Sequence, residues 1–294
     1  MVLSWYPLHD RGFAMVLMIG VDGGGSGCRV VVAEAAGTVL SRAEGGPANI
    51  ATDPEGAQRR ILDCCEGAVR QAAGSAAAAE MRRAHAGLGL AGANAQGAAD
   101  RLIAALPFAR CRIETDAMTA ARGALGPDDG ILAAIGTGSV FVRQMAGRLR
   151  QFGGWGIVLG DEGSGARLGR SALRRALLAD EGFVPMTALL SDLLQRHGGP
   201  SGVIAFSLAA TPADLAPMAR EIAGSGDPAC AAIWAESVSD IAGMLASLGA
   251  GRSLPVTFAG GMARPYADAL PQLPQRPARG TSLDGALMLA RGLT

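Results

Sequence analysis

Short apolar runs that stop at glycines mark three places far apart in the chain. They are residues 19–26 (IGVDGGGS), 131–139 (ILAAIGTGS) and 256–261 (VTFAGG). Each run predicts a buried strand, and the glycines after it allow a backbone turn with positive φ and close approach to a ligand. Such loops leave amide N–H groups free to bind an anion, so the three together indicate a site for nucleotide phosphates.

The first half of the chain reads as an α/β pattern with an antiparallel edge. Three strands come first, and the amphipathic helix after them has Asp53 as its start signal. Two further strand–helix pairs complete the order βββ-α-β-α-β-α. The predicted strands are residues 16–21, 28–34, 38–42, 86–90 and 112–114, and helices are expected to start near residues 53, 98 and 117.

A second copy of this opening begins at residue 131, with strands expected near 131–135, 140–144 and from 149. Helices are expected at 171–180, 185–196, 212–223, 227–248 and 283–291, with a strand at 255–259. The repeat predicts an internal duplication with a cleft between two lobes. We expect an N-terminal lobe of residues 15–117 plus 280–294, a C-terminal lobe of 118–279, and a disordered or non-core leader at 1–14.

Composition narrows the chemistry. All 26 basic residues are arginine, which excludes a lysine-containing P-loop, the strand lysine of protein kinases and Schiff-base catalysis. The 26 acidic residues bring the formal charge to zero, so neither nucleic acid nor a membrane surface is an expected partner. Five cysteines without a CxxC pair argue against a disulfide framework and a structural zinc, and favour reduced thiols in a cytoplasm.

Two carboxylates are the main catalytic candidates. Asp22 ends the first strand, where it can hold waters of a magnesium ion or serve as an Asp-Gly turn residue. Asp116 separates a strand from a helix, so it can be an N-cap or the general base of a phosphoryl transfer. The base role is favoured because the chain has no lysine and its three histidines lie outside the glycine loops.

Other polar residues lie close to glycines. Ser26 and Thr137 each offer a hydroxyl to a phosphate, or simply form turns. Residues 152–169 (FGGWGIVLGDEGSGARLG) are too glycine-rich for a helix interior, and Trp155 there can stack on a sugar face. Asp161 can accept hydrogen bonds from sugar hydroxyls or an ammonium group. Asn49 comes after the third strand, where it either faces the cleft or forms an ordinary turn.

The motif series resembles the BadF/BadG/BcrA/BcrD-type ATPase family, and within it the glucosamine and N-acetylglucosamine kinases. The resemblance covers residue 15 to the end through IGVDGGGSGCR, GGPANI, LGLAGA, TDA, IGTGS, GGWGIVLGDEGSGARLG, FAGGMA and DGALMLA. It implies an α/β fold of two RNase-H-like lobes of the actin/hexokinase type, each with a mixed βββαβαβα-type sheet. It also implies ATP and Mg²⁺ as cofactors.

The resemblance assigns roles by position. It makes Asp116 the base that takes the proton of a sugar 6-hydroxyl, and Asp22 a metal ligand through water. It places the sugar against Asn49, Asp116, Gly154, Trp155 and Asp161. The residues implied for ATP are Asp22, Gly23, Gly24, Gly25, Ser26, Gly136, Thr137, Gly138, Ser139, Gly260 and Gly261.

The expected function is a cytoplasmic, ATP-dependent kinase of glucosamine or N-acetylglucosamine. The motifs do not decide between the two sugars, since GGWG resembles the N-acetylglucosamine kinases and GPANI resembles the glucosamine kinases. Two alternatives remain: an ATPase activator of a 2-hydroxyacyl-CoA dehydratase, whose shared iron–sulfur cluster needs suitably placed cysteines, and a non-catalytic sugar-binding protein. The sequence leaves the oligomeric state open, with a homodimer as one candidate.

Overall fold

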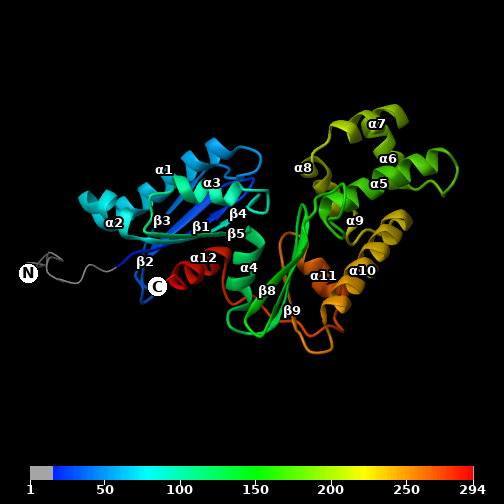
Figure 1. Ribbon diagram of the computed structural model, residues 1–294. Helices are drawn as coiled ribbons and strands as arrows, with labels where there is room; N and C mark the ends of the chain where they lie inside the picture. Colours follow the sequence, from blue (N-terminus) through cyan, green and yellow to red (C-terminus); the bar gives the residue numbers. More distant parts are fainter. Residues whose placement is uncertain (1–15, 294) are drawn as a thin grey trace, which may run out of the picture. The chain divides into compact units, whose positions relative to one another are not determined.

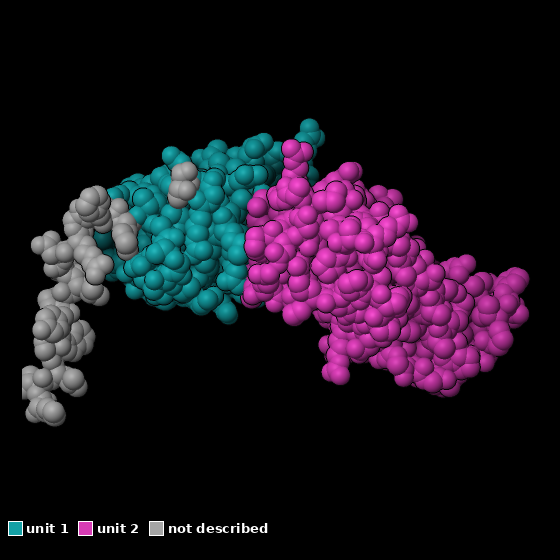
Figure 2. Space-filling model, turned by 90° about the horizontal axis from the view of Figure 1, so that it is seen from below, with its two compact units in different colours: residues 1–119, 283–294 teal, residues 120–282 magenta. Residues whose placement is uncertain are grey.

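A computed structural model describes residues 16–293, so the leader expected at residues 1–14 lies outside the described residues. The chain divides into two compact units, coloured separately in Figure 2. The first unit contains Met1–Thr119 and Leu283–Thr294, and the second contains Ala120–Ser282. The chain therefore returns to its first unit at the end. The boundary between the units falls inside helix α4 (Asp116–Leu125).

The first unit is built on a five-stranded mixed sheet in the order β3-β2-β1-β4-β5. The first three strands form an antiparallel meander, while β4 and β5 run parallel to β1. This is the mixed arrangement that the sequence predicted. The strands are β1 (Met18–Gly23), β2 (Cys28–Ala33), β3 (Val39–Gly45), β4 (His85–Leu90) and β5 (Arg110–Glu114).

Side chains alternate between the two faces of this sheet, and each face packs against different helices. Ile19 and Val21 of β1 belong to the core formed with α1 (Pro54–Ala73), α2 (Ala77–Arg83) and α3 (Ala98–Ala105). Met18 instead packs with Leu283 and Leu287 of the C-terminal helix α12 (Ser282–Arg291). Helices of the first unit therefore cover both faces of the sheet (Figure 1).

Helix α1 shows how local sequence fixes an element. Asp53 is its N-cap, because the carboxylate accepts a hydrogen bond from the Gly56 amide at 3.0 Å. Pro54 occupies the first helical turn, where its missing N–H costs nothing. The buried face carries Ala57 and Ile61, as the helical spacing predicts.

The second unit contains a four-stranded sheet in the order β8-β7-β6-β9. It repeats the antiparallel meander and adds one parallel strand, where the first sheet has two. Its strands are β6 (Gly130–Ile135), β7 (Ser139–Met145), β8 (Arg148–Gly153) and β9 (Val256–Ala259). The two halves thus share a βββ opening but differ in the number of parallel strands added to it.

Helices make up the rest of the second unit (Figure 1), and some differ from expectation. The helix expected at 212–223 is broken into three short pieces, and α7 and α11 were not expected. Helix α7 was missed because apolar residues fill most of it without helical periodicity. The helices are α5 (Gly165–Asp180), α6 (Ala188–His197), α7 (Pro200–Ala209), α8 (Pro212–Leu215), η2 (Ala216–Met218), α9 (Ala219–Ile222), α10 (Pro228–Leu248) and α11 (Ala263–Ala269).

Among the described residues, α10 alone is long and apolar enough to cross a membrane by length and composition. Its residues Ile233, Ile241 and Leu245 are nonetheless part of the second unit's core. The apolar character of α10 is therefore explained by its packing against the other helices and the sheet.

Candidate active site

The carboxyl ends of the parallel strands bring the candidate catalytic residues of the first unit to one edge of its sheet. Asp22 lies opposite Gly89 of β4, and Gly89 lies opposite Glu114 of β5. Asp116 comes after β5 with a single connecting residue between them. Ligands of such sheets bind outside the carboxyl ends of the strands, and this edge carries Asp22 and Asp116.

Asp22 is largely buried, with 9% of its surface exposed. It forms an ion pair with Arg29, its cross-strand neighbour on β2. The sequence pattern gave no sign of this arginine, because only the hairpin register shows that the two residues face each other. Arg29 holds a positive charge beside the first glycine loop, in a chain that has no lysine.

The glycines of the first loop differ from expectation in their backbone conformation. None of Gly23, Gly24 and Gly25 has a φ between +20° and +160°. A Cβ atom at Gly24 or Gly25 would meet no described atom within 4 Å, and Ser26 beside them is exposed. The expectation of positive φ is therefore wrong for this loop. Its glycines leave open space, which suits close approach of a ligand.

Asn49 lies beside this loop. Its side-chain oxygen accepts hydrogen bonds from the amides of Ala51 at 2.9 Å and Thr52 at 3.3 Å, so it forms a turn. The preceding residue, Ala48, donates its amide to the Gly24 carbonyl at 2.8 Å. The turn thus fixes residues 48–52 against the first glycine loop, while the Asn49 side-chain NH₂ group forms no hydrogen bond with another residue of 16–293.

Asp116 is not the side-chain cap of α4. The Thr115 hydroxyl accepts from the Met118 amide at 3.3 Å and performs that role, so Asp116 is the first helical residue. One carboxylate oxygen of Asp116 accepts from the Ala117 amide at 2.8 Å. The side chain is exposed, yet nearby protein atoms remove part of its solvation. This loss raises its pKa, and the negative charge of Asp22 raises it further.

The second glycine loop, residues 136–139, joins β6 to β7. The first turn of α5 hydrogen-bonds to this loop. The Gly165 amide donates to the Gly136 carbonyl at 2.8 Å, and the Ala166 amide donates to the Thr137 carbonyl at 3.2 Å. Ser139 is buried, and its hydroxyl donates to the Glu162 carbonyl at 2.7 Å. This hydroxyl is therefore engaged inside the protein, whereas Thr137 is exposed at the tip of the loop.

Asp161 lies against the same loop. Its carboxylate accepts from the Ser139 amide at 3.4 Å, and a Cβ at Gly138 would lie 3.0 Å from one of its oxygens. Only 6% of its surface is exposed, and this burial raises its pKa. Its φ of +62° is in the left-handed region, which aspartate tolerates better than most residues. The structure thus gives Asp161 a supporting position beneath the second glycine loop.

The third glycine pair comes directly after β9. Gly260 has a φ of +90°, and a Cβ there would lie 2.4 Å from the Ile135 carbonyl oxygen, so only glycine fits. A Cβ at Gly261 would meet no described atom within 4 Å. The Met262 amide donates to the Ile135 carbonyl at 2.9 Å, which joins this turn to the end of β6. The second and third glycine segments are therefore neighbours.

The glycine-rich segment between β8 and α5 contains more helix than expected. Helix α5 starts at Gly165, with the buried Ser164 hydroxyl accepting from the Arg167 amide at 3.1 Å as N-cap. Before it, Gly154 has a φ of +72° and Trp155 is 68% exposed. Gly169 lies inside α5, at a position where a Cβ would be only 2.3 Å from the Leu215 carbonyl oxygen, so a larger residue would not fit. Close packing therefore explains a glycine that intrinsic propensity disfavours.

Comparison with known proteins agrees with this geometry. Residues 19–276 match the profile of the BadF/BadG/BcrA/BcrD ATPase family. The chain belongs to this family. Its fold is the α/β fold of two mixed sheets also seen in a ROK family glucokinase from Streptomyces griseus, at 20% identity and a TM-score of 0.55 over 94% of this chain and 99% of that one.

Two proteins with higher sequence identity to this chain than that glucokinase are named as sugar kinases. A glucosamine kinase of Vibrio cholerae serotype O1 is 30% identical over 281 residues, covering 92% of this chain and 95% of that protein. The crystal structure of a putative N-acetylglucosamine kinase from Chromobacterium violaceum is 32% identical to this chain with a TM-score of 0.79, and the match covers 94% of this chain and 99% of that one.

The metal expected with ATP in this family needs few protein ligands. Among the described residues there is no group of three or more His, Cys, Asp or Glu side chains that could hold a metal ion alone. Mg²⁺ usually keeps several waters and takes one or two carboxylates plus substrate phosphates. Asp22 and Asp116, near enough for one charge to raise the other's pKa, fit that donor set.

Four of the five cysteines are buried, and Cys111 is half-buried. Cys28, Cys64 and Cys65 are buried in the first unit's core, and Cys111 packs against it. Cys230 is buried in the second unit's core. A cluster shared between two subunits requires thiolates at the surface. The positions of these cysteines therefore argue against the activator alternative.

Proposed function

We propose that this protein is an amino-sugar kinase that transfers the γ-phosphate of ATP to the 6-hydroxyl of glucosamine or N-acetylglucosamine in the cytoplasm. The chain is a phosphotransferase that uses ATP and has an alcohol group of a sugar as acceptor, in line with its kinase relatives. The amino sugar, the 6-hydroxyl and the cellular location are the proposed parts.

The observation that carries the proposal is the placement of Asp116 at the same sheet edge as Asp22 and the first glycine loop. A hydroxyl nucleophile needs a positioned carboxylate to accept its proton, and a raised pKa makes that carboxylate a better acceptor. Because Thr115 caps the helix, Asp116 is not required for capping. We assign it as the general base.

The glycine loops would bind the phosphates. Gly24 and Gly25 offer open backbone in the first unit, and Thr137 is exposed at the tip of the loop in the second. Asp22 would hold a magnesium ion through water, and the ion would neutralise charge on the β- and γ-phosphates. Ser26 and Gly261 are further proposed contacts to ATP. Catalysis then consists mainly of positioning and electrostatic stabilisation.

The proposed sugar contacts are Asn49 and Asp116 in the first unit, and Gly154 and Trp155 in the second. An exposed indole provides an apolar face for stacking, and the Asn49 NH₂ group provides a hydrogen-bond donor. Asp161 would act indirectly, since its buried carboxylate contacts the second glycine loop. This modifies the direct sugar contact expected for it from the sequence.

An ADP-release assay with Mg²⁺ and ATP tests the function. Glucosamine, N-acetylglucosamine and glucose are compared with a reaction without sugar, and the phosphorylated position is read by NMR. Strong stimulation by one amino sugar, with phosphate on the 6-oxygen, is the expected result. Equal turnover without sugar would favour an ATPase activator, and sugar binding without turnover would favour a binding protein.

A further inference from the structure

Two cysteine thiols from different elements meet in the core of the first unit, Cys28 of β2 and Cys64 of α1. Cys28 is the register partner of Gly45 on β3, and Cβ positions of such a pair are about 4.5–5.5 Å apart. A Cβ at Gly45 would lie 3.7 Å from both the Cβ and the Sγ of Cys64. The Cys64 thiol therefore lies over Gly45, where it accepts a hydrogen bond from the Cys28 thiol.

This contact makes the two thiols unequal. The hydrogen bond from Cys28 lowers the pKa of Cys64, against the opposing effects of burial and of the Glu44 charge. The same hydrogen bond, together with burial, raises the pKa of Cys28. Cys64 is 6% exposed, whereas Cys28 is 0% exposed. Since the thiolate is the reactive form of cysteine, Cys64 is the sulfur that a small oxidant reaches and reacts with first.

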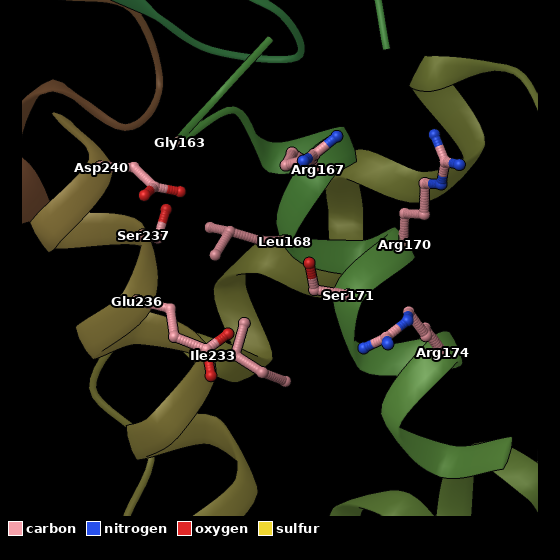
Figure 3. Close-up of a pocket in the computed structure, with 10 residues that line it drawn as sticks. All are labelled: Gly163, Arg167, Leu168, Arg170, Ser171, Arg174, Ile233, Glu236, Ser237 and Asp240. Atoms are coloured by element: carbon pink, nitrogen blue, oxygen red, sulfur yellow. The ribbon is translucent and has the colours of Figure 1, made fainter. Parts of the chain in front are cut away.

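The other cysteines in the described part of the chain lack this combination. Burial raises the pKa of Cys65, Cys111 and Cys230, that of Cys111 to about 12. Cys230 is the one cysteine of the second unit, and the ten residues that line the pocket of about 320 Å³ between α5 and α10 (Figure 3) include no thiol. Oxidation by a small reagent is therefore expected first at the pair in the first unit.

The pair lies at the base of the first glycine loop. Cys28 is the register partner of Gly23, and between them the Gly24 amide donates to the Gly27 carbonyl at 2.9 Å. A Cβ at Gly27 would lie 3.3 Å from the Gly45 carbonyl oxygen, so this end of the loop is packed against the end of β3. A shift of Cys28 toward α1 would therefore also move the backbone of the loop.

We propose that Cys28 and Cys64 form a reversible disulfide in response to a peroxide, and that this bond ties the base of the first glycine loop to α1. A covalent bond between the sulfurs is shorter than a hydrogen-bonded contact, so β2 and α1 must approach each other. The loop then loses part of the freedom that close approach of phosphates requires. Weaker binding of ATP is the consequence, and only this consequence rests on the proposed function.

The chemistry needs no reactant besides the peroxide. The Cys64 thiolate attacks one peroxide oxygen, so an S–O bond forms, the O–O bond breaks and hydroxide leaves, taking up the proton that Cys64 released. The Cys28 sulfur then attacks the sulfur of the Cys64 sulfenic acid. The S–S bond forms, the S–O bond breaks, and the departing hydroxide takes the Cys28 proton. In total the two thiols lose two electrons and two protons, and hydrogen peroxide becomes two waters.

Reversal requires a dithiol, which reduces the bond by thiol–disulfide exchange. In a reducing compartment the pair would thus be reduced at rest and oxidised transiently, as is usual for cytosolic disulfides with a sensing role.

Peptide mapping by tandem mass spectrometry tests the disulfide in the full-length protein after treatment with hydrogen peroxide and alkylation of the remaining thiols. Cleavage after arginine places Cys28 in the peptide 12–29 and Cys64 in the peptide 61–70. The expected result is a bond between Cys28 and Cys64 that dithiothreitol removes. Cys64→Ala should abolish the link between the two peptides, whereas Cys111→Ala, which removes a half-buried cysteine of the same unit, should retain it.

A wild type that forms no bond between Cys28 and Cys64, or one in which Cys65 forms the bond instead, would overturn the inference. This readout does not depend on the folding of any variant, because the wild type alone decides it. It also measures neither nucleotide nor sugar. A protein that forms the disulfide but phosphorylates no amino sugar would therefore overturn the proposed function alone.

The effect on the loop is measured on reduced and oxidised wild type. Hydrogen exchange without nucleotide should be slower in residues 23–28 after oxidation. Calorimetric affinity for a non-hydrolysable ATP analogue with Mg²⁺ should fall about tenfold, within the usual range for coupling between two sites, and return with dithiothreitol. Cys64→Ala should bind the analogue equally before and after peroxide. A disulfide-bonded protein with unchanged exchange in the loop would overturn the link between the pair and the glycine loop.

Discussion

At the scale of single residues, Asp116 has the clearest consequence for activity. Asp116→Asn keeps the size of the side chain and leaves the Thr115 cap in place, but it removes the proton acceptor. Turnover should fall about 10²–10⁴-fold, the usual contribution of general base catalysis. Affinity for ATP, measured by calorimetry, should remain unchanged. Wild-type turnover in this variant would exclude Asp116 as the base.

The pKa of Asp116 predicts how activity depends on pH. The carboxylate must be ionised to accept a proton, and both loss of solvation and the Asp22 charge raise its pKa above the ordinary aspartate value of 3.8. Activity should therefore be present at neutral pH and be lost as pH falls through this raised value. The acid limb of kcat/KM against pH measures it. A limb at or below 3.8 would contradict the prediction.

Asp161 predicts an effect on stability. Its pKa is raised by burial and by the Glu162 charge, so ionisation costs folding energy above the raised value and costs nothing below the unfolded one. Asp161→Asn tolerates the positive φ and removes this cost. Its stability should equal or exceed wild type at pH 7, with the difference shrinking at acid pH.

Asp161→Ala is the contrasting variant. It keeps a strained φ of +62° and loses the acceptor for the Ser139 amide. We expect it to unfold about 1–3 kcal/mol more easily than the wild type. Thermal unfolding across pH compares both variants. Equal destabilisation by Asn and Ala would show that the carboxylate charge itself supports the fold.

Sequence reasoning locates residues that come after a strand and before a glycine. It does not identify contacts between residues that strand register or a long loop brings together. Asp22 and the glycine loops were found because they interrupt apolar runs. Arg29 was missed because its partner is set by the hairpin register. The contact of Asp161 with Ser139 spans 22 residues and depends on the whole path of the segment between them. For Asp116, the sequence could not separate capping from catalysis, because the adjacent Thr115 can also cap.

At the scale of elements, two helical glycines look alike in sequence and differ in their surroundings. A Cβ at Gly169 in α5 would lie 2.3 Å from the Leu215 carbonyl oxygen, whereas a Cβ at Gly243 in α10 meets no described atom within 4 Å. Propensity alone treats them equally. Because propensity disfavours glycine in a helix interior, the sequence prediction started α5 only after Gly169, at residue 171, whereas the helix starts at residue 165.

The pair gives a matched prediction. Gly169→Ala should destabilise the second unit by about 1–3 kcal/mol, because backbone must move to admit the methyl group. Gly243→Ala should stabilise it by about 0.5–1 kcal/mol, since alanine loses less entropy in a helix. Urea unfolding of both variants measures the free energies. Stabilisation by Gly169→Ala would show that α5 and α8 can separate without cost.

At the scale of the whole molecule, the chain closes on its first unit. Helix α12 packs on the sheet face formed by Met18 and Val31, and the Arg110 side chain donates to the carbonyl of Leu293. A Cβ at Gly87 in β4 would lie 2.2 Å from the Ala286 carbonyl oxygen, so α12 lies directly on the sheet. The sequence predicted a terminal helix from its periodicity. Its return to the first unit was implied only by the family resemblance, since no local pattern records a contact between chain ends.

This closure makes the first unit depend on residues at the far end of the chain. Ala286→Glu places a carboxylate at a position with 0% exposure against the sheet, which should cost several kcal/mol. Met288→Glu changes the same helix on its 43% exposed side and should cost little. Hydrogen exchange measured by mass spectrometry distinguishes the outcomes. Ala286→Glu should lose protection in β1, β2 and β4, while β6 and β7 keep theirs because their sheet belongs to the other unit. Equal loss of protection in both sheets would mean that the two units unfold as one cooperative body.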